Sequence, residues 1–191
     1  MIQRVCVYCG STPGVKPIYR DLAIELGRSL AAEGLELVYG GGRVGLMGAL
    51  ADACLEAGGR VTGVIPRDLW DREVGHTGLT DLRIASDMHD RKAAMATLAD
   101  GFIALPGGFG TLEELFEQLT WLQLGHHAKP VALLDVDGFY GPLVEFVAKA
   151  SEAGFIKPAH RDLLQRAETV ADAIQVLRNP PVAAVSKWVE E

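Results

Sequence analysis

Residues 101–114 read GFIALPGGFGTLEE, an apolar run followed by a proline, three glycines within four positions and the start of an amphipathic segment. The pattern predicts a β-strand over 101–105, a tight turn from Pro106 onward and a helix over 111–124. Glycines at such a turn let the main chain approach a ligand closely, and the first turn of the helix offers N–H groups without partners. The stretch therefore predicts an anion site at a strand-to-helix turn of an α/β protein.

The same alternation of strand and helix runs along most of the chain. Strands are predicted over residues 2–8, 36–39, 60–65, 81–85, 101–105 and 130–135, and helices over 18–33, 45–57, 88–99, 111–124, 140–152 and 160–178. Repeated β-α units of this length predict a single-domain, Rossmann-like α/β fold, a doubly wound parallel sheet with helices on both faces. We expect this domain to span residues 1–180 and a short C-terminal tail to span 181–191.

Composition excludes several classes of protein. Of the 191 residues, 49% are hydrophobic and 23% are charged, so the chain can bury a substantial core and is not disordered. The net charge is −7 and no basic block interrupts the sequence, which argues against a nucleic-acid partner. No apolar run approaches the roughly 18 residues of a membrane span, and the first residues lead into a strand without a signal-like segment. We expect a cytoplasmic protein that binds no membrane.

The cysteines and histidines indicate no metal or redox site. Cys6 and Cys9 spell C-x-x-C, but residues three apart on a strand face opposite sides, whereas a redox pair needs a helix N-terminus. Cys54 lies in an apolar helix and is expected to fill the core. No zinc-ligand spacing occurs, so we expect neither a metal nor another cofactor.

The turn after residue 105 suits a single phosphate group. It lacks the lysine and the following hydroxyl of G-x-x-x-x-G-K-[ST], which serve triphosphates with magnesium, so a monophosphate is expected. Thr111 and Glu114 are open to two interpretations. Thr-x-x-Glu is a capping box. A carboxylate beside a phosphate-binding turn is unfavourable unless it meets another partner, such as a ribose hydroxyl or a developing cation, and this favours a role of Glu114 in the site.

A second glycine-rich turn follows the strand over 36–39 and reads GGGRVGLMG at residues 40–48. Gly40, Gly42 and Gly45 match the G-x-G-x-x-G of dinucleotide-binding proteins, but no acidic residue stands at the strand end about 20 residues later, where the ribose contact belongs. The pattern therefore favours tight packing of helix on strand, or a loop lining a different nucleotide pocket, over an NAD-dependent reductase.

Two basic residues, Arg91 and Lys92, stand in the first turn of the helix over 88–99, after Met88, His89 and Asp90. Basic side chains there oppose the helix dipole, which favours acids. They are either solvated surface charges or part of a site, in which the donor fork of Arg91 holds phosphate or ribose oxygens.

These segments together resemble the signatures of the Lonely Guy (LOG) family, the cytokinin riboside 5′-monophosphate phosphoribohydrolases. Residues 106–114 match the family pattern P-G-G-x-G-T-x-x-E in full, and the likeness runs from Cys9 to about residue 160. The sequence departs from the family at Phe109, where tyrosine is common, and at Asp90, where glutamate or glutamine is usual. Relatives are often labelled lysine decarboxylases, but nothing in this sequence indicates a lysine that would bind pyridoxal phosphate.

The resemblance implies hydrolysis of the N-glycosidic bond of AMP, or of its N6-isopentenyl derivative, to the free base and ribose 5-phosphate. It makes Arg91 and Glu114 the catalytic pair. Loss of a purine passes through an oxocarbenium-like state, which a carboxylate such as Glu114 can stabilise. The acid that protonates the leaving base is left open between solvent, Asp90 and Glu73. A non-catalytic module that senses or carries a nucleotide is the alternative.

The resemblance also implies the residues that bind substrate. Gly107, Gly108, Gly110 and Thr111 would hold the 5′-phosphate with Lys92 nearby, Met88 would pack on the base, and Glu73 and Glu113 complete the set.

The helix over 111–124 is apolar around most of its circumference, since Trp121 and Leu124 lie off its main apolar stripe. Such a helix is either buried centrally or forms a subunit interface. The resemblance implies a homodimer with helices crossing at the interface.

Overall fold

The computed structural model describes residues 1–72 and 75–180. Its strands are β1 (Arg4–Tyr8), β2 (Glu36–Tyr39), β3 (Val61–Pro66), β4 (Asp81–Ala85), β5 (Gly101–Ala104), β6 (Val131–Leu134) and β7 (Gln165–Ala167). Its helices are α1 (Pro17–Ala32), α2 (Gly45–Glu56), α3 (Arg67–Trp70), α4 (Met88–Leu98), α5 (Phe109–Leu124), α6 (Gly141–Glu152), α7 (Pro158–Arg161) and α8 (Val170–Arg178). The predicted tail over 181–191 lies outside the described residues.

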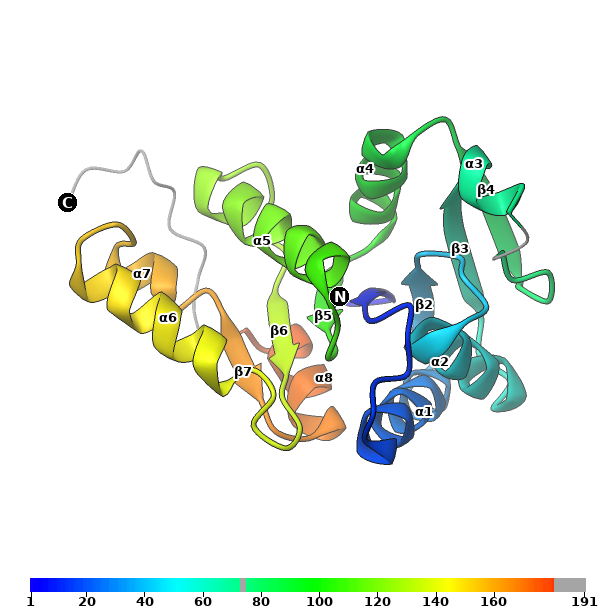
Figure 1. Cartoon of the computed structure of the whole chain (residues 1–191), viewed down its shortest axis with the longest axis horizontal. Helices are drawn as coiled ribbons and strands as arrows, with labels where there is room; N and C mark the ends of the chain where they lie inside the picture. The colour runs from blue at the N-terminus through cyan, green and yellow to red at the C-terminus, as the bar shows by residue number, and fades with distance from the viewer. Residues whose placement is uncertain (73–74, 181–191) are drawn as a thin grey trace.

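The seven strands form one parallel sheet in the order β4-β3-β2-β1-β5-β6-β7. The chain winds outward in one direction from β1 to β4 and in the other from β5 to β7, so the order reverses between β1 and β5. Helices cover both faces: α1, α2 and α8 pack on one face, and α4, α5 and α6 lie on the other (Figure 1). The predicted doubly wound α/β fold is confirmed.

Alternate residues of the strands feed two apolar cores, one on each face of the sheet. On β1, Val5 and Val7 face the core under α1, α2 and α8, and Cys6 faces the core under α4 and α5. Cys9 belongs to the first core, so the two cysteines of C-x-x-C lie on opposite faces, and both are buried and free. The prediction that these two cysteines face opposite sides of the sheet is confirmed. No helix within the described ranges is long and apolar enough to cross a membrane.

The predicted helix over 160–178 is wrong. The chain there forms the short helix α7, then β7, which pairs with β6, and then α8. The hydroxyl of Thr169 accepts a hydrogen bond from the N–H of Asp172 at 3.1 Å and so caps the start of α8. A strand of three residues is too short to show a period of two, and its place depends on pairing with β6.

Candidate active site

A cavity of about 550 Å³ lies at the carboxyl ends of β1 and β5, where the strand order reverses. This is the place where doubly wound sheets bind ligands. Three turns contribute to its wall: the turn after β1 with Gly10 and Ser11, the turn after β2 with Gly40 and Gly42, and the turn after β5 with Gly108 and Gly110. Both glycine-rich segments of the sequence therefore meet at one cavity.

The turn after β5 brings the start of α5 to the cavity. Gly108 is the N-cap of this helix of 16 residues, and Gly110 and the buried Thr111 also line the cavity. Gly107 lies behind them, where a Cβ atom would come within 2.1 Å of Thr111 Oγ1 and 3.0 Å of the Gly10 nitrogen. Only glycine fits at that position, and the N–H groups of the first helical turn are available to an anion.

The capping-box interpretation of Thr111 and Glu114 is wrong. The helix begins at Phe109, two residues earlier than predicted, so Thr111 lies inside its first turn, and no side chain caps the N-terminus. Glu114 instead points toward α4, where it meets Arg91.

Arg91 and Glu114 form a buried ion pair in the wall of the cavity. Nη1 of Arg91 donates to Oε1 of Glu114 at 2.7 Å, and each residue is 8% exposed. Nε of Arg91 also donates to the carbonyl oxygen of Val64 at 3.1 Å. The guanidinium lies against Gly40, where a Cβ atom would come within 2.1 Å of Nη2. The sheet therefore fixes the arginine, and the arginine fixes the carboxylate.

The pKa of Glu114 is raised above its ordinary value. Burial raises it, and this effect outweighs the opposing effects of the Arg91 charge and hydrogen bond. A carboxyl group whose pKa lies closer to neutrality in a cavity is suited to proton transfer or to stabilising positive charge.

This shift predicts the pH dependence of turnover. If Glu114 acts as a carboxylate in the hydrolysis that the family resemblance implies, kcat/KM falls on acidification, with an apparent pKa above the ordinary 4.5 of a glutamate, because kcat/KM reports ionisations of the free protein. The sign follows because a raised pKa keeps more of the group protonated, and therefore inactive, at a given acidic pH. Steady-state rates measured over the acid range give this pH profile. The control variant Glu117→Gln should show the same fall in rate on acidification as the wild type. A kcat/KM that stays constant down to pH 4.5 would contradict the assignment.

Lys92 and Glu113 lie beside the pair but are joined to each other. The ammonium of Lys92 is hydrogen-bonded to the carboxylate of Glu113 and donates to Oε1 of Glu117 at 3.0 Å. Burial lowers the pKa of Lys92, but its hydrogen bonds to these two carboxylates raise it by more. Glu113 lines the cavity. The ammonium of Lys92 thus links α4 to α5 through two carboxylates. Its contact with a phosphate stays a prediction.

The acids at the start of α4 cap the helix. Oδ1 of Asp87 accepts from the N–H groups of His89 at 2.8 Å and Asp90 at 2.9 Å. These N–H groups, with that of Asp90 first, lower the pKa of Asp87. Oδ2 of Asp90 accepts from the Ser86 N–H at 2.9 Å. These two acids supply the negative charge that the dipole favours at the start of a helix. Arg91, in the same turn, is directed to Glu114 in the cavity wall.

The remaining part of the cavity wall is apolar. It is lined by Val44, Met47, Ile65, Leu69, Met88 and Met95. Met88 is 45% exposed, so it lies at the rim with an accessible side chain. Sequence reasoning found only Met88 in this group, because the others come from four elements, α2 with its N-cap residue, β3, α3 and α4, and share no local pattern. Glu73 lies outside the described residues.

The turn after β2 owes its glycines to close packing. Gly41 and Gly45 have positive φ of 74° and 64°, and a Cβ atom on Gly45 would come within 2.3 Å of the Ser11 carbonyl carbon. The N–H of Leu46 donates to the Gly10 carbonyl at 3.1 Å. This supports the packing interpretation of the segment, and Gly40 and Gly42 line the cavity as well.

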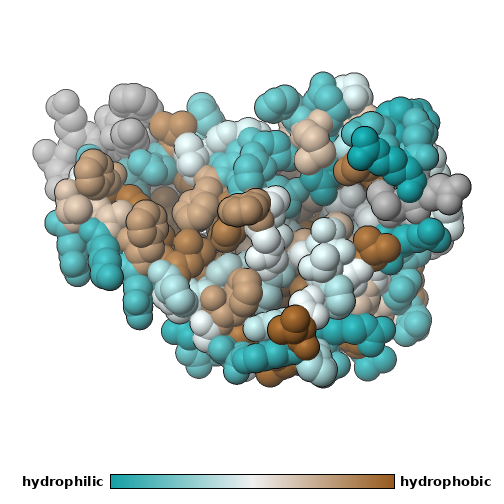
Figure 2. Space-filling view, in the orientation of Figure 1, coloured by the Kyte–Doolittle hydropathy of each residue, from teal (hydrophilic) through white to brown (hydrophobic). Residues whose placement is uncertain are grey.

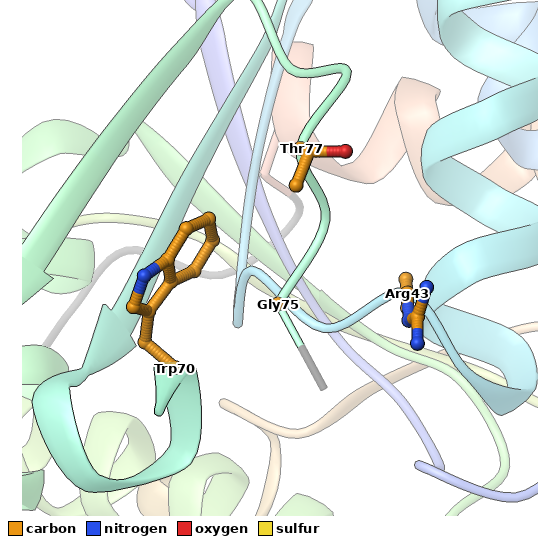
Figure 3. A pocket seen from close by; sticks show the side chains of 4 residues that line it. All are labelled: Arg43, Trp70, Gly75 and Thr77. Carbon is orange, nitrogen blue, oxygen red and sulfur yellow. The ribbon is translucent and has the colours of Figure 1, made fainter. Parts of the chain in front are cut away.

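Residues 75–80 are tied to the same turn. Gly75 pairs with Gly42, and the N–H of His76 donates to the Gly41 carbonyl at 2.9 Å. Nε2 of His76 donates to Oδ1 of Asp52 at 2.9 Å, since its Nδ1 accepts from Gly78. A smaller hollow of about 290 Å³ lies on this side, lined by Arg43, Trp70, Gly75 and Thr77, with the indole and the guanidinium on either side of Gly75 (Figure 3).

The fold and the cavity define a Rossmann-like α/β protein in which the first turn of α5 adjoins a buried arginine–glutamate pair. No group of three or more His, Cys, Asp or Glu side chains that could hold a metal occurs in residues 1–72 and 75–180. The chain belongs to the LOG family of cytokinin riboside 5′-monophosphate phosphoribohydrolases, and a family model described as "Possible lysine decarboxylase" matches residues 47–177.

Relatives from plants match nearly the whole chain. The chain is 50% identical over 194 residues to the probable cytokinin riboside 5′-monophosphate phosphoribohydrolase LOGL2 of Oryza sativa subsp. japonica, covering 99% of this chain and 80% of that protein. It is 46% identical to the cytokinin riboside 5′-monophosphate phosphoribohydrolase LOG1 of Arabidopsis thaliana, covering 99% of this chain and 91% of that protein.

Solved structures share the fold at lower identity. The molybdenum cofactor binding protein of the phototrophic bacterium Rippkaea orientalis has a TM-score of 0.71 at 21% identity, covering 93% of this chain and 96% of that one. A likeness at this identity concerns the fold alone.

Proposed function

We propose that this protein hydrolyses the N-glycosidic bond of AMP or of an N6-substituted AMP, giving the free base and ribose 5-phosphate. The observation that carries the proposal is the single cavity in which the first turn of α5 adjoins the Arg91–Glu114 pair. The relatives named as cytokinin riboside 5′-monophosphate phosphoribohydrolases support the same reaction.

Phosphate binding and bond cleavage are carried by different residues of the cavity. The turn of Gly108, Gly110 and Thr111 binds the 5′-phosphate through main-chain N–H groups, and Gly107 lets the turn close. Glu114 stabilises the positive charge that develops on the ribose as the bond from C1′ to the base breaks, or activates the water that adds to C1′. Arg91 holds Glu114 in place.

The apolar part of the cavity suits the base. Met88, Met95 and Leu69 offer the flexible and aliphatic surface on which a purine and an apolar N6 substituent pack. The polar part then faces the ribose phosphate. One cavity with a polar and an apolar region thus fits the two halves of the substrate.

Turnover of a nucleotide panel tests the reaction. We expect purified protein to release adenine and ribose 5-phosphate from AMP, and the corresponding base from N6-isopentenyl AMP, as chromatography of the products would detect. The matching nucleosides, which lack the phosphate, are the control and should react much more slowly. Binding of these nucleotides without release of base would instead support a carrier or sensor and would contradict the hydrolase.

We also propose that the protein is a cytoplasmic homodimer. Its three free cysteines fit a reducing compartment. Apolar side chains gather on the surface over α5 and α6 (Figure 2), where Phe146 is 64% exposed and Phe155, just after α6, is 87% exposed. Phe116 on α5 is also exposed. Exposed apolar side chains clustered on neighbouring helices favour a protein interface, and a second copy would bury them.

Charge placed on this surface is expected to dissociate the dimer. Phe146→Glu puts a carboxylate into a buried apolar contact, which costs several kcal/mol if the contact exists. Sedimentation velocity should then show a monomer, whereas Val15→Glu, an equally drastic change at another exposed apolar residue, should leave a dimer. A dimer that survives Phe146→Glu would place the interface elsewhere.

A further inference from the structure

The Tyr140 side chain connects α6 to the start of the phosphate-binding turn. Its hydroxyl donates to the carbonyl oxygen of Leu105 at 2.6 Å. Leu105 lies between the end of β5 and Pro106, and both Tyr140 and Leu105 are buried. Burial raises the pKa of Tyr140, so the phenol remains a protonated donor. The last carbonyl before the turn is therefore held by a side chain from another element.

Tyr140 is itself held by a buried carboxylate. Its N–H donates to Oδ1 of Asp135 at 2.9 Å, and Nε of Arg166 donates to Oδ2 of the same residue at 2.9 Å. The N–H of Asp135 donates to the Ala167 carbonyl at 2.9 Å. A chain of hydrogen bonds thus runs from the edge strand β7 through the end of β6 to the end of β5.

The turn has little freedom on its other side. The N–H of Leu105 donates to the Tyr8 carbonyl at 2.9 Å, and the N–H of Gly10 donates to the Pro106 carbonyl at 3.1 Å. Gly107 packs directly against Thr111 and Gly10. These contacts hold the main chain of the turn on both sides. A shift of the Leu105 carbonyl therefore also shifts the main-chain N–H groups that face the cavity.

We propose that Tyr140 is a positioning residue for phosphate binding: Asp135 holds the main-chain N–H of Tyr140, and the Tyr140 hydroxyl fixes the Leu105 carbonyl and with it the direction of the N–H groups in the turn. The inference concerns the binding of the phosphoryl group, and it rests on the proposed function only for the identity of the substrate. Tyr140 does not line the cavity and acts through Leu105 alone.

Tyr140→Phe tests the role, with Tyr39→Phe as a matched control. Both tyrosines are buried, but Tyr39 lies in the core on the opposite face of the sheet, and its hydroxyl has no hydrogen-bond partner among the described residues. The two substitutions remove the same atom. We expect Tyr140→Phe to weaken binding of inorganic phosphate about tenfold by calorimetry, and Tyr39→Phe to leave it within about twofold, since misplacement of binding groups by an ångström costs up to about a hundredfold.

The kinetic readout separates positioning from stability. Tyr140→Phe should raise KM for AMP about tenfold with kcat within about threefold, because it removes binding that ground state and transition state share. The inhibition constant of adenine, which occupies only the base region, should not change. A lowered melting temperature with unchanged phosphate affinity and unchanged KM would show a merely structural hydrogen bond and overturn the proposal.

A second variant, Asp135→Asn, tests the same chain of hydrogen bonds. If Tyr140→Phe does not fold, Asp135→Asn replaces it, because loss of the charge that holds Arg166 loosens the same chain and should weaken phosphate binding about threefold. Unchanged phosphate affinity in that variant would overturn the proposal.

The failure of the proposed function and the failure of the positioning role are distinguishable. If the wild-type protein binds phosphate, if Tyr140→Phe weakens that binding, and if no nucleotide releases its base, the proposed function fails and the positioning role stands. If base is released and Tyr140→Phe binds phosphate normally, only the positioning role fails.

Discussion

Glu114→Gln is expected to lower kcat for AMP by about 10²–10⁴-fold while AMP binding stays within about threefold, the size of loss typical when a general acid–base group is removed. The amide has nearly the same shape as the carboxylate, and its oxygen can still accept the hydrogen bond from Arg91 Nη1. What it loses is the negative charge and the ability to take up a proton. The variant therefore separates chemistry from binding.

Glu117→Gln is the matched control. Glu117 lies one turn further along α5 and also pairs with a basic residue of α4, Lys92. The same chemical change there should alter kcat by less than about threefold, since the side chain does not line the cavity. Single-turnover rates and equilibrium binding of AMP measure both variants. Turnover in Glu114→Gln within tenfold of the wild type would remove Glu114 from the chemical step.

Gly40→Ala is expected to lower kcat/KM for AMP by about 10²-fold, although the change adds a single methyl group at a residue that is not a predicted phosphate contact. Its Cβ atom would lie 2.1 Å from Arg91 Nη2 and 3.2 Å from the sulfur of Met47. The guanidinium cannot move without weakening its bonds to Glu114 and Val64. The effect is steric, because Gly40 is not among the glycines with positive φ.

Gly141→Ala is the control for this substitution. Among the described residues nothing lies within 4 Å of the Cβ position at Gly141, which is the first residue of α6. Alanine there should leave kcat/KM unchanged and the melting temperature equal or higher. We expect Gly40→Ala to remain folded, as circular dichroism would show, so that its loss reports a displaced Arg91. Wild-type kinetics in a folded Gly40→Ala would contradict the fixed position of the pair.

The sequence predicted the fold because its main signals are local. Alternating apolar runs and amphipathic segments mark six of the seven strands, and parallel β-α units lead to few topologies. A tight turn at residues 106–110 was also predictable, since it holds three glycines after a proline, and its binding of an anion stays a prediction.

The tertiary structure alone decided which charges meet. Arg91 and Lys92 are neighbours on α4, yet Arg91 pairs with Glu114 and Lys92 pairs with Glu113 and Glu117. From the residue types alone both could be surface charges or site residues, and only the family resemblance assigned Arg91 and Glu114 to one site, because the partners lie more than 20 positions away on another helix. The strand β7 was missed for a related reason, since pairing with β6 creates it.

Local periodicity and glycine placement thus determined the fold and the position of the glycine-rich turn after β5 from the sequence by itself. The pairing of Arg91 with Glu114, the contact of that arginine with Gly40 and the link from Tyr140 to Leu105 came only from the packed molecule. The physical reason is that hydrophobic period and turn chemistry act between residues near in sequence. A buried charge or hydroxyl instead takes whichever partner the packing of distant elements leaves within reach.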